Sequence, residues 1–168
     1  MTMPAQKPGR SKQDYQTPED FVLAVQRRLH IPYFGWDLAA DKDNTQATRF
    51  FTEDDDSLKQ VWSSLYYNAA MPEWLWLNPP YADIEPWVKK ASEESRLGAF
   101  VAMLVPASVG ANWWRDYVEF ESYQLFLNGR IKFVGAKDYY PKDCALLLYT
   151  PFIRSGSAVW DWRSNAAT

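Results

Sequence analysis

Residues 74–87, "WLWLNPPYADIEPW", decide the fold because three kinds of structure follow one another there. The apolar stretch 73–77 is typical of a buried strand, and in 83–95 the apolar side chains recur at helical spacing. Between the two lies a corner with two prolines, which can extend neither a strand nor a helix. The stretch therefore predicts a strand, a rigid corner and a helix.

The corner Asn78-Pro79-Pro80-Tyr81 has the chemistry of a site. Each proline fixes its own φ and biases the preceding residue toward extended geometry, so the corner is rigid. It offers two acceptors in fixed directions, the side-chain carbonyl of Asn78 and the backbone carbonyl of Pro79. An exocyclic amine on a nucleobase has two hydrogens to donate, and a tyrosine ring can stack on the base. The corner thus predicts a site that grips a planar aromatic amine and aims it at an electrophile.

Alternating strands and helices predict an open α/β sheet, whose ligands bind beyond the carboxyl ends of the strands. In the first expected helix, Thr17 is the predicted N-cap and Pro18 the first helical residue. The Asn128-Gly129 pair predicts a hairpin turn. The expected elements are helices at 17–30, 83–95 and 110–120, strands at 73–77, 98–106 and 144–152, and a hairpin over 122–134. Within 33–41 we expect a short strand that runs into a loop at Asp37.

Composition narrows the function classes. The net charge of −3 excludes a polycation that coats nucleic acid. With His30 and Cys144 as the only residues of their kinds, neither a usual zinc site nor an internal disulfide can form, so we expect no metal. A Ser-His-Asp triad would have to use His30, and no nucleophile motif points to it.

Length and hydropathy predict a cytoplasmic protein of one domain. The 168 residues suit a single core, and we expect a flexible basic tail at 1–13 and one domain at 14–168. No apolar leader or membrane-length apolar run is present in the sequence, so neither export nor membrane spanning is indicated. A lone cysteine fits a reducing compartment.

Several motifs in order resemble the small phage-type (Dam-like) DNA N6-adenine methyltransferases over roughly residues 14–150. The segments that carry the resemblance are "YQTPEDF", "FGWDLAAD", "RFFTEDDDSL", "WLNPPYADIEPWVKKA", "VAMLVPA" and "GRIKF". The resemblance implies a Rossmann-like methyltransferase fold with a mixed, mostly parallel sheet and flanking helices. It also implies methyl transfer from S-adenosylmethionine to the N6 amine of an adenine flipped out of double-stranded DNA.

The resemblance further implies site residues. Asn78, Pro79, Pro80 and Tyr81 match the catalytic motif, and a carboxylate at Asp37 suits the ammonium of the cofactor's methionine part. The loop "DLAAD" lacks the glycines that many methyltransferases have there. The implied cofactor contacts are Gln16, Thr17, Pro18, Asp37, Ala39 with Ala40, and Asn78, together with Asp55 or its neighbours Asp54 and Asp56 for the ribose hydroxyls. For that acidic run, a solvated helix start is an equal alternative.

DNA contacts are expected from aromatic and basic residues downstream of the catalytic motif. For the tryptophans the alternative is core packing, and for the lysines it is ordinary solvation. The candidates are Trp114, Arg115, Arg130, Lys132 and Lys137, with Asn112, Trp113, Tyr139, Tyr140 and Lys142 nearby.

Two alternatives to DNA methylation stay open at this point. The same motif serves methyltransferases that act on RNA amino groups or on protein glutamine amides. A catalytically inactive DNA-binding module with the same fold is the other alternative. The sequence leaves open the oligomeric state and the recognition site, for which GATC is a guess from the resemblance.

Overall fold

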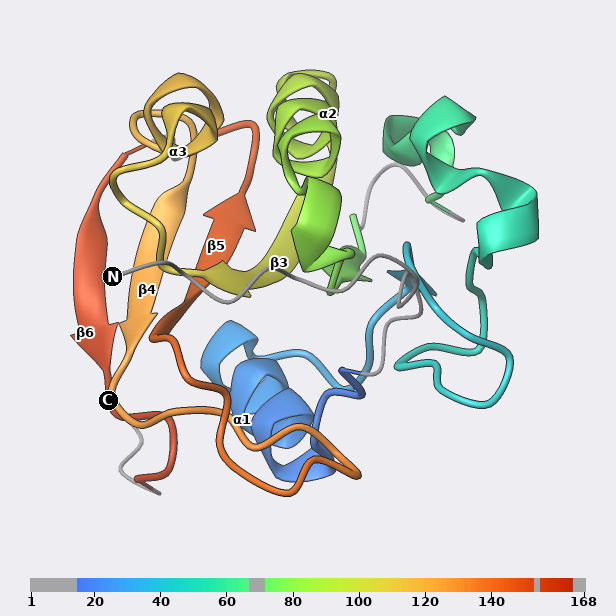
Figure 1. Cartoon of the computed structure of the whole chain (residues 1–168). Helices are drawn as coiled ribbons and strands as arrows, with labels where there is room; N and C mark the ends of the chain where they lie inside the picture. Colours follow the sequence, from blue (N-terminus) through green and yellow to red (C-terminus); the bar gives the residue numbers. More distant parts are fainter. Residues whose placement is uncertain (1–14, 67–71, 153–154, 165–168) are drawn as a thin grey trace.

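A computed structural model describes residues 15–66, 72–152 and 155–164, so the expected tail at 1–13 lies outside the described residues. The centre of the protein is a six-stranded sheet in the order β1-β2-β3-β5-β4-β6 (Figure 1). Its strands are β1 (Trp36–Asp37), β2 (Trp74–Leu77), β3 (Phe100–Pro106), β4 (Tyr123–Leu127), β5 (Cys144–Tyr149) and β6 (Ser157–Trp160).

The strand directions bring two polar residues to one edge of the sheet. Strands β1, β2 and β3 are parallel, β5 is antiparallel to both of its neighbours, and β6 is parallel to β4. Asp37 ends β1 opposite Trp76 of β2, and Asn78 follows the end of β2. The carboxyl ends of the two strands therefore place Asp37 and Asn78 side by side.

Helices cover both faces of the sheet. Helix α1 (Glu19–Leu29) lies on one face, and α2 (Glu85–Arg96) and α3 (Asn112–Tyr117) lie on the other (Figure 1). Side chains of β3 alternate between the two cores: Val101 and Met103 pack on the side of α2 and α3, while Ala102 and Leu104 pack on the side of α1. This burial on both faces explains why the strand reads as a continuous apolar run.

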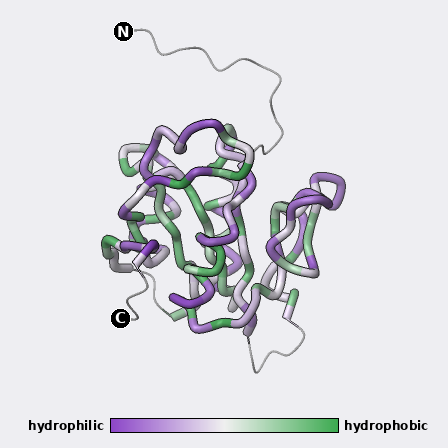
Figure 2. The backbone as a smooth tube through the Cα atoms, turned by 90° about the horizontal axis from the view of Figure 1, so that it is seen from below, coloured by the Kyte–Doolittle hydropathy of each residue, from purple (hydrophilic) through white to green (hydrophobic). Residues whose placement is uncertain are grey.

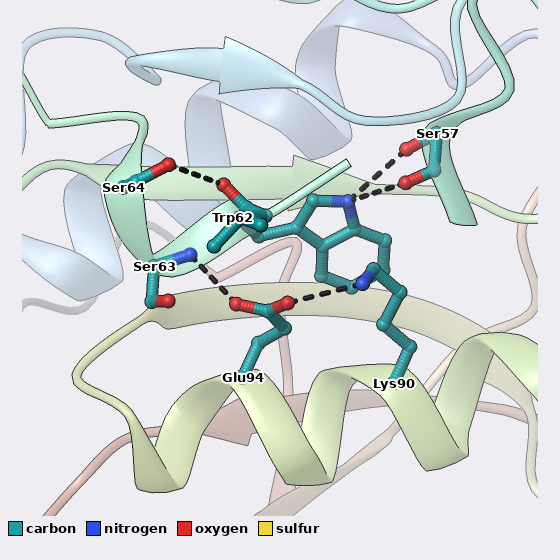
Figure 3. Close-up of polar contacts among 7 residues, drawn as sticks. Ser57, Trp62, Ser63, Ser64, Lys90 and Glu94 are labelled. Atoms are coloured by element: carbon teal, nitrogen blue, oxygen red, sulfur yellow. Dashed lines mark hydrogen bonds and ion pairs between the residues drawn. The ribbon is translucent and has the colours of Figure 1, made fainter. Parts of the chain in front are cut away.

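Residues 53–64, between β1 and β2, stand out to one side in Figures 1 and 2 and consist largely of short 3-10 turns. These turns are η1 (Glu53–Asp55), η2 (Ser57–Lys59) and η3 (Trp62–Ser64). The segment is fastened to α2 by Glu94, which accepts hydrogen bonds from the backbone N–H of Ser63 at 2.8 Å and from the Lys90 ammonium at 3.0 Å (Figure 3). The buried ring of Trp62 lies beneath that ammonium, 5.2 Å from ring centroid to Nζ.

Most predicted elements are confirmed, but the start of the first helix is not where we expected it. The helix begins at Glu19, and Pro18 rather than Thr17 is its N-cap residue. Thr17 is instead buried and accepts a hydrogen bond from Asn78. A tertiary contact thus replaces the local cap that the sequence pattern favours.

The predicted hairpin over 122–134 is wrong. Strand β4 ends at Leu127 and pairs with β5 and β6, not with the residues that follow it. Ile131 and Phe133 alternate with exposed residues because they are buried in the core on the α1 side. An extended segment lying over a sheet produces the same alternation as a strand within one.

One strand falls outside the expected pattern. The short strand expected to run into a loop at Asp37 is confirmed as β1, which has only two residues, but β6 was not predicted. Among the described residues, no helix has the length and apolar character needed to cross a membrane.

Candidate active site

Asp37 is a buried carboxylate at the carboxyl end of β1, 3% exposed. Its Oδ1 accepts the backbone N–H of Ala39 at 3.2 Å, and its Oδ2 accepts that of Gln46 at 2.9 Å. Burial raises the pKa of Asp37 to about 6, although these two hydrogen bonds act in the opposite direction. Within the described ranges no lysine or arginine pairs with it, so the carboxylate can accommodate a cationic ligand.

Asn78 is held in one orientation by the segment before α1. Its side-chain Nδ2 donates to the backbone carbonyl of Tyr15 at 3.0 Å and to Oγ1 of Thr17 at 3.1 Å. Because a carbonyl oxygen can only accept, the amide group facing Tyr15 must be the NH2. The Oδ1 atom is therefore directed away from these two residues.

Asp37 and Asn78 line one small pocket. Four of the residues expected in the cofactor and catalytic sets meet there, namely Thr17, Asp37, Ala39 and Asn78. Tyr15, Asn44, Gln46 and Trp76 complete its lining. Gln16 and Pro18 lie beside Thr17 in the chain but are not among these residues, and the backbone of Gln16 instead forms a bridge to Val134.

Tyr81 belongs to an aromatic cluster at the same corner. Its ring stacks on Tyr15 with centroids 5.7 Å apart and an interplanar angle of 21°, and it also contacts Phe133 and Tyr140. Its hydroxyl is buried without a hydrogen-bond partner in the part of the chain that the structure describes. Burial raises the pKa of Tyr81 well above its ordinary value, so the phenol stays neutral. Tyr81 thus offers an aromatic face, and Tyr15, 40% exposed, covers it.

The acidic turn after β1 is placed at the same edge of the sheet. Phe50 forms a parallel bridge with Asp37, and the turn follows directly. The carboxylate of Asp55, however, caps its own turn by accepting the backbone N–H of Thr52 at 2.7 Å and its hydroxyl at 2.9 Å. These hydrogen bonds lower the pKa of Asp55. Asp55 thus has a local structural role in the structure, while Asp54 beside it is exposed.

The residues expected to contact DNA fall into two groups on opposite faces of the sheet. Arg115 is exposed on α3, where it pairs with Asp116 at 2.7 Å. Trp114 is only 4% exposed and packs in the core beside Phe126, so its predicted contact with DNA conflicts with its position. For the Trp114 ring, the alternative of core packing is therefore confirmed.

The remaining candidates lie on the side of α1. Arg130, Lys132 and Lys137 are all exposed in the loop between β4 and β5. Arg130 pairs with Asp143 at 3.3 Å, and Lys132 lies 6.0 Å from the ring centroid of Tyr139.

Sequence reasoning missed four residues that line the pocket, namely Tyr15, Asn44, Gln46 and Trp76. Asn44 and Gln46 come from the polar stretch "DKDNTQ", which looked like an ordinary loop after Asp37. The one signal that this stretch could line a ligand site was its position after the first strand of a parallel sheet. Tyr15 belongs to the quoted motif "YQTPEDF", but nothing in the sequence indicated that its ring covers Tyr81.

Comparisons with known proteins show which family the chain belongs to. A model of the DNA N-6-adenine-methyltransferase (Dam) family matches residues 5–153. A protein named DNA N-6-adenine-methyltransferase from Escherichia phage T1 is 26% identical over 102 residues, which cover 61% of this chain and 39% of the phage protein. Another of that name from Haemophilus phage HP1 (strain HP1c1) is 28% identical over 131 residues, or 74% of this chain and 71% of that protein.

The chain thus spans less than half the length of the phage T1 relative. No solved structure matches it with significant similarity. Because the family match covers most of the sequence, including the corner at 78–81, the chain belongs to the DNA N-6-adenine-methyltransferase (Dam) family.

Proposed function

We propose that the protein is an S-adenosylmethionine-dependent methyltransferase that methylates the N6 amine of a flipped adenine in double-stranded DNA. The observation that carries the proposal is that Asp37 and Asn78, from the ends of two parallel strands, line one pocket. Family membership and the names of the two phage relatives support the choice of reaction and substrate. The mostly parallel sheet with helices on both faces agrees with a Rossmann-like methyltransferase fold.

Asp37 would hold the ammonium of the cofactor's methionine part. A buried carboxylate with only neutral N–H donors around it is costly, and a bound cation offsets that cost. The nearby polar groups of Asn44 and Gln46 extend the same lining. We propose Asp54, rather than Asp55, as the acid of the turn that meets the ribose, because the carboxylate of Asp55 already caps Thr52.

Asn78 and Pro79 would grip the adenine amine. Oδ1 of Asn78 and the backbone carbonyl of Pro79 accept its two hydrogens, which draws electron density onto nitrogen and prepares it for attack. S-adenosylmethionine supplies the methyl group as an electrophile. Held there by Asn78 and Pro79, N6 would attack the methyl carbon, the sulfur would leave as the thioether, and the amine would release one proton to solvent.

Tyr81 would stack on the extruded base, with Pro79 and Pro80 fixing the corner. The Tyr15 ring lies where such a base must go, because its centroid is 5.7 Å from that of Tyr81. A base between two rings needs roughly 7 Å, twice the contact distance of stacked carbon atoms. Tyr15 therefore moves aside when adenine enters.

Arg130, Lys132 and Lys137 would contact the phosphates of the DNA backbone, since all three are exposed in the loop whose Tyr140 contacts Tyr81. We further propose that the protein acts in the cytoplasm of a bacterial host, as its phage relatives suggest.

The test is transfer of labelled methyl from S-adenosylmethionine to duplex DNA, to RNA and to protein extract in parallel. We expect label in DNA, recovered as N6-methyladenine after digestion to nucleosides. Label found only in RNA, or only in protein glutamine, would show that DNA is not the substrate and that RNA or protein is. No label anywhere, together with DNA binding but no cofactor binding, would identify an inactive DNA-binding module.

A further inference from the structure

The C-terminal turn at 161–164 is joined to the loop that carries the expected DNA contacts. Nη2 of Arg163 donates to the backbone carbonyl of Arg130 at 2.7 Å, and Nε1 of Trp162 donates to that of Gly129 at 3.1 Å. The guanidinium of Arg163 also lies 4.5 Å from the ring centroid of Trp162. Arg163 is thus held by a hydrogen bond and a ring contact although it is exposed.

Gly129 makes room for this arrangement. Its φ of +105° favours glycine, and a Cβ at this position would collide with Nη1 of Arg163. The guanidinium therefore lies directly over the backbone of the turn after β4. Since stacking and the hydrogen bond have already fixed it, binding an anion costs little further side-chain entropy.

Arg163 shares an exposed aromatic ring with Lys132. Tyr139 is 58% exposed, with the Arg163 guanidinium 5.9 Å and the Lys132 ammonium 6.0 Å from its ring centroid. Acidic residues in these segments are Asp138, Asp143, which pairs with Arg130, and Asp161. No ion pair with a described residue holds Arg163 or Lys132, so both cations can bind an external anion.

This basic surface adjoins the catalytic corner. Tyr140, next to Tyr139 in the chain, turns inward and contacts Tyr81 at 5.8 Å and Tyr15 at 5.6 Å between ring centroids. The loop therefore presents cations outward at Tyr139 while Tyr140 supports the proposed base site. The cations at Tyr139 are thus one residue along the chain from a ring that contacts Tyr81.

We propose that Arg163, with Lys132 and Tyr139, forms a surface that binds the backbone phosphates of duplex DNA beside the flipped adenine. A fixed guanidinium with free N–H groups suits phosphate oxygens. The turn lies beyond residue 153, where the family match ends, so it adds a contact that family membership does not provide. The inference rests on the proposed function, because it takes DNA as the substrate.

The experiment compares Arg163→Gln with wild type in the full chain, with Lys89→Gln as the matched control. Lys89 is an exposed cation on α2, on the opposite face of the sheet. Duplex binding is measured by fluorescence anisotropy across a salt series, and S-adenosylmethionine affinity by calorimetry. We expect Arg163→Gln to weaken DNA binding several-fold and to reduce the slope of log K against log salt by about 0.9, the loss of one phosphate contact.

Cofactor affinity should not change in Arg163→Gln, and Lys89→Gln should behave as wild type. A wild-type salt slope in Arg163→Gln overturns the inference, whereas failure of the wild type to bind DNA at all would overturn the proposed function instead. Should Arg163→Gln unfold, Lys132→Gln decides the question with the same expected change in slope. Weaker binding to an acidic peptide, with DNA binding unaffected, would identify a protein partner and contradict the proposal.

Discussion

At the residue scale, the account depends on two polar side chains that the protein buries at some cost. Asp37 keeps a carboxylate out of water with two N–H donors and no described cation, and Asn78 is 7% exposed with its amide fixed by Tyr15 and Thr17. Packing alone would favour apolar side chains at both positions. Under the proposed function, ligands that carry the complementary groups would account for both residues.

Asp37 gives a pH prediction. Its pKa of about 6 means that the carboxylate becomes protonated as the pH falls through 6 and can then no longer bind an ammonium. We expect S-adenosylmethionine affinity, measured by calorimetry, to fall roughly tenfold for each pH unit below 6. Asp37→Asn should bind weakly with little pH dependence; wild-type affinity that stays constant from pH 7 to pH 5 would contradict the role of Asp37.

The same shift predicts how the cofactor-free protein responds to pH. Because the folded-state pKa is raised above the ordinary 3.8, the ionised form is disfavoured by folding. The contribution of Asp37 to stability is therefore most favourable below 3.8 and decreases as the pH rises through 6. Denaturant titrations of wild type and Asp37→Asn should diverge over that window, with the variant gaining relative stability toward higher pH. Curves that stay parallel would count against the raised pKa.

Thr17 predicts a defect in rate rather than in cofactor binding. Its hydroxyl accepts from Nδ2 of Asn78, so Thr17→Val removes one of the two contacts that orient the amide proposed to bind adenine. We expect the single-turnover rate to fall about tenfold, equivalent to one hydrogen bond of about 1.4 kcal/mol, with S-adenosylmethionine affinity changed less than the rate. Thr17→Ser, which keeps the hydroxyl, should restore most of the rate. Equal rates in the valine and serine variants would remove Thr17 from this role.

At the scale of elements, the sequence predicted the helices and strands whose apolar pattern follows directly from which of their faces are buried. Strand β3 and helix α2 are confirmed because one is buried on both faces and the other on a single stripe. The predicted hairpin was wrong because Ile131 and Phe133 belong to a loop, which packs these two side chains into the core. Strand β6 was missed because a short edge strand, with alternate residues exposed, carries little pattern.

The anchor of the 53–64 segment on α2 was equally invisible in the sequence. Lys90 and Glu94 have the spacing of an ordinary solvent-exposed helical pair, yet their side chains are only 17% and 7% exposed. Their burial depends on Trp62 and Ser63, which come from a distant part of the chain. A pair pattern on one helix cannot reveal what covers it.

This anchor predicts a loss of stability. Glu94→Ala leaves the Ser63 N–H and the Lys90 ammonium without their shared acceptor, and we expect the free energy of unfolding to fall by about 3 kcal/mol in a denaturant titration. Glu94→Gln, which keeps an acceptor but loses the charge, should lose less. A change within 0.5 kcal/mol, or about the scatter of surface substitutions, would show that the pair is not a structural anchor.

The effect should also depend on pH. Burial alone would raise the pKa of Glu94, but the Ser63 and Lys90 hydrogen bonds outweigh it and lower the pKa below the ordinary 4.5. The stabilisation is therefore present above 4.5 and is lost as the pH falls through the lower folded-state value. The gap between wild type and Glu94→Gln should close on acidification.

At the scale of the whole molecule, the site is made by topology. Parallel pairing of β1 with β2 brings Asp37 and Asn78 together, and the segment before α1 crosses to them from the N-terminal side. The corner at 78–81 could be proposed as catalytic from the sequence because its chemistry is local, and the resemblance to a family supplied Asp37; that Asn78 and Asp37 both line one pocket is what the fold adds. Asn44, Gln46 and the Tyr15 ring could not be predicted, since the path of a loop leaves no periodic signal.

The expected DNA contacts show the same limit. Residue types alone made Trp114, Arg130 and Lys132 equal candidates for DNA contact. In the fold, Trp114 is buried, whereas Arg130 and Lys132 are exposed on the opposite face of the sheet. Arg163 joined that surface only through contacts across the sheet's edge, between the chain after β6 and the loop after β4. Which residues share one surface therefore depends on the fold and cannot be read from the order of residues in the sequence.

The most direct test of the central claim separates binding from chemistry within the pocket. S-adenosylmethionine affinity and the single-turnover rate of N6-methyladenine formation in duplex DNA are measured for wild type, Asp37→Asn and Asn78→Ala. We predict that Asp37→Asn loses affinity, and that Asn78→Ala keeps affinity while its rate falls by at least about a hundredfold. Transfer at the wild-type rate by Asn78→Ala, or wild-type affinity in Asp37→Asn, would contradict the account.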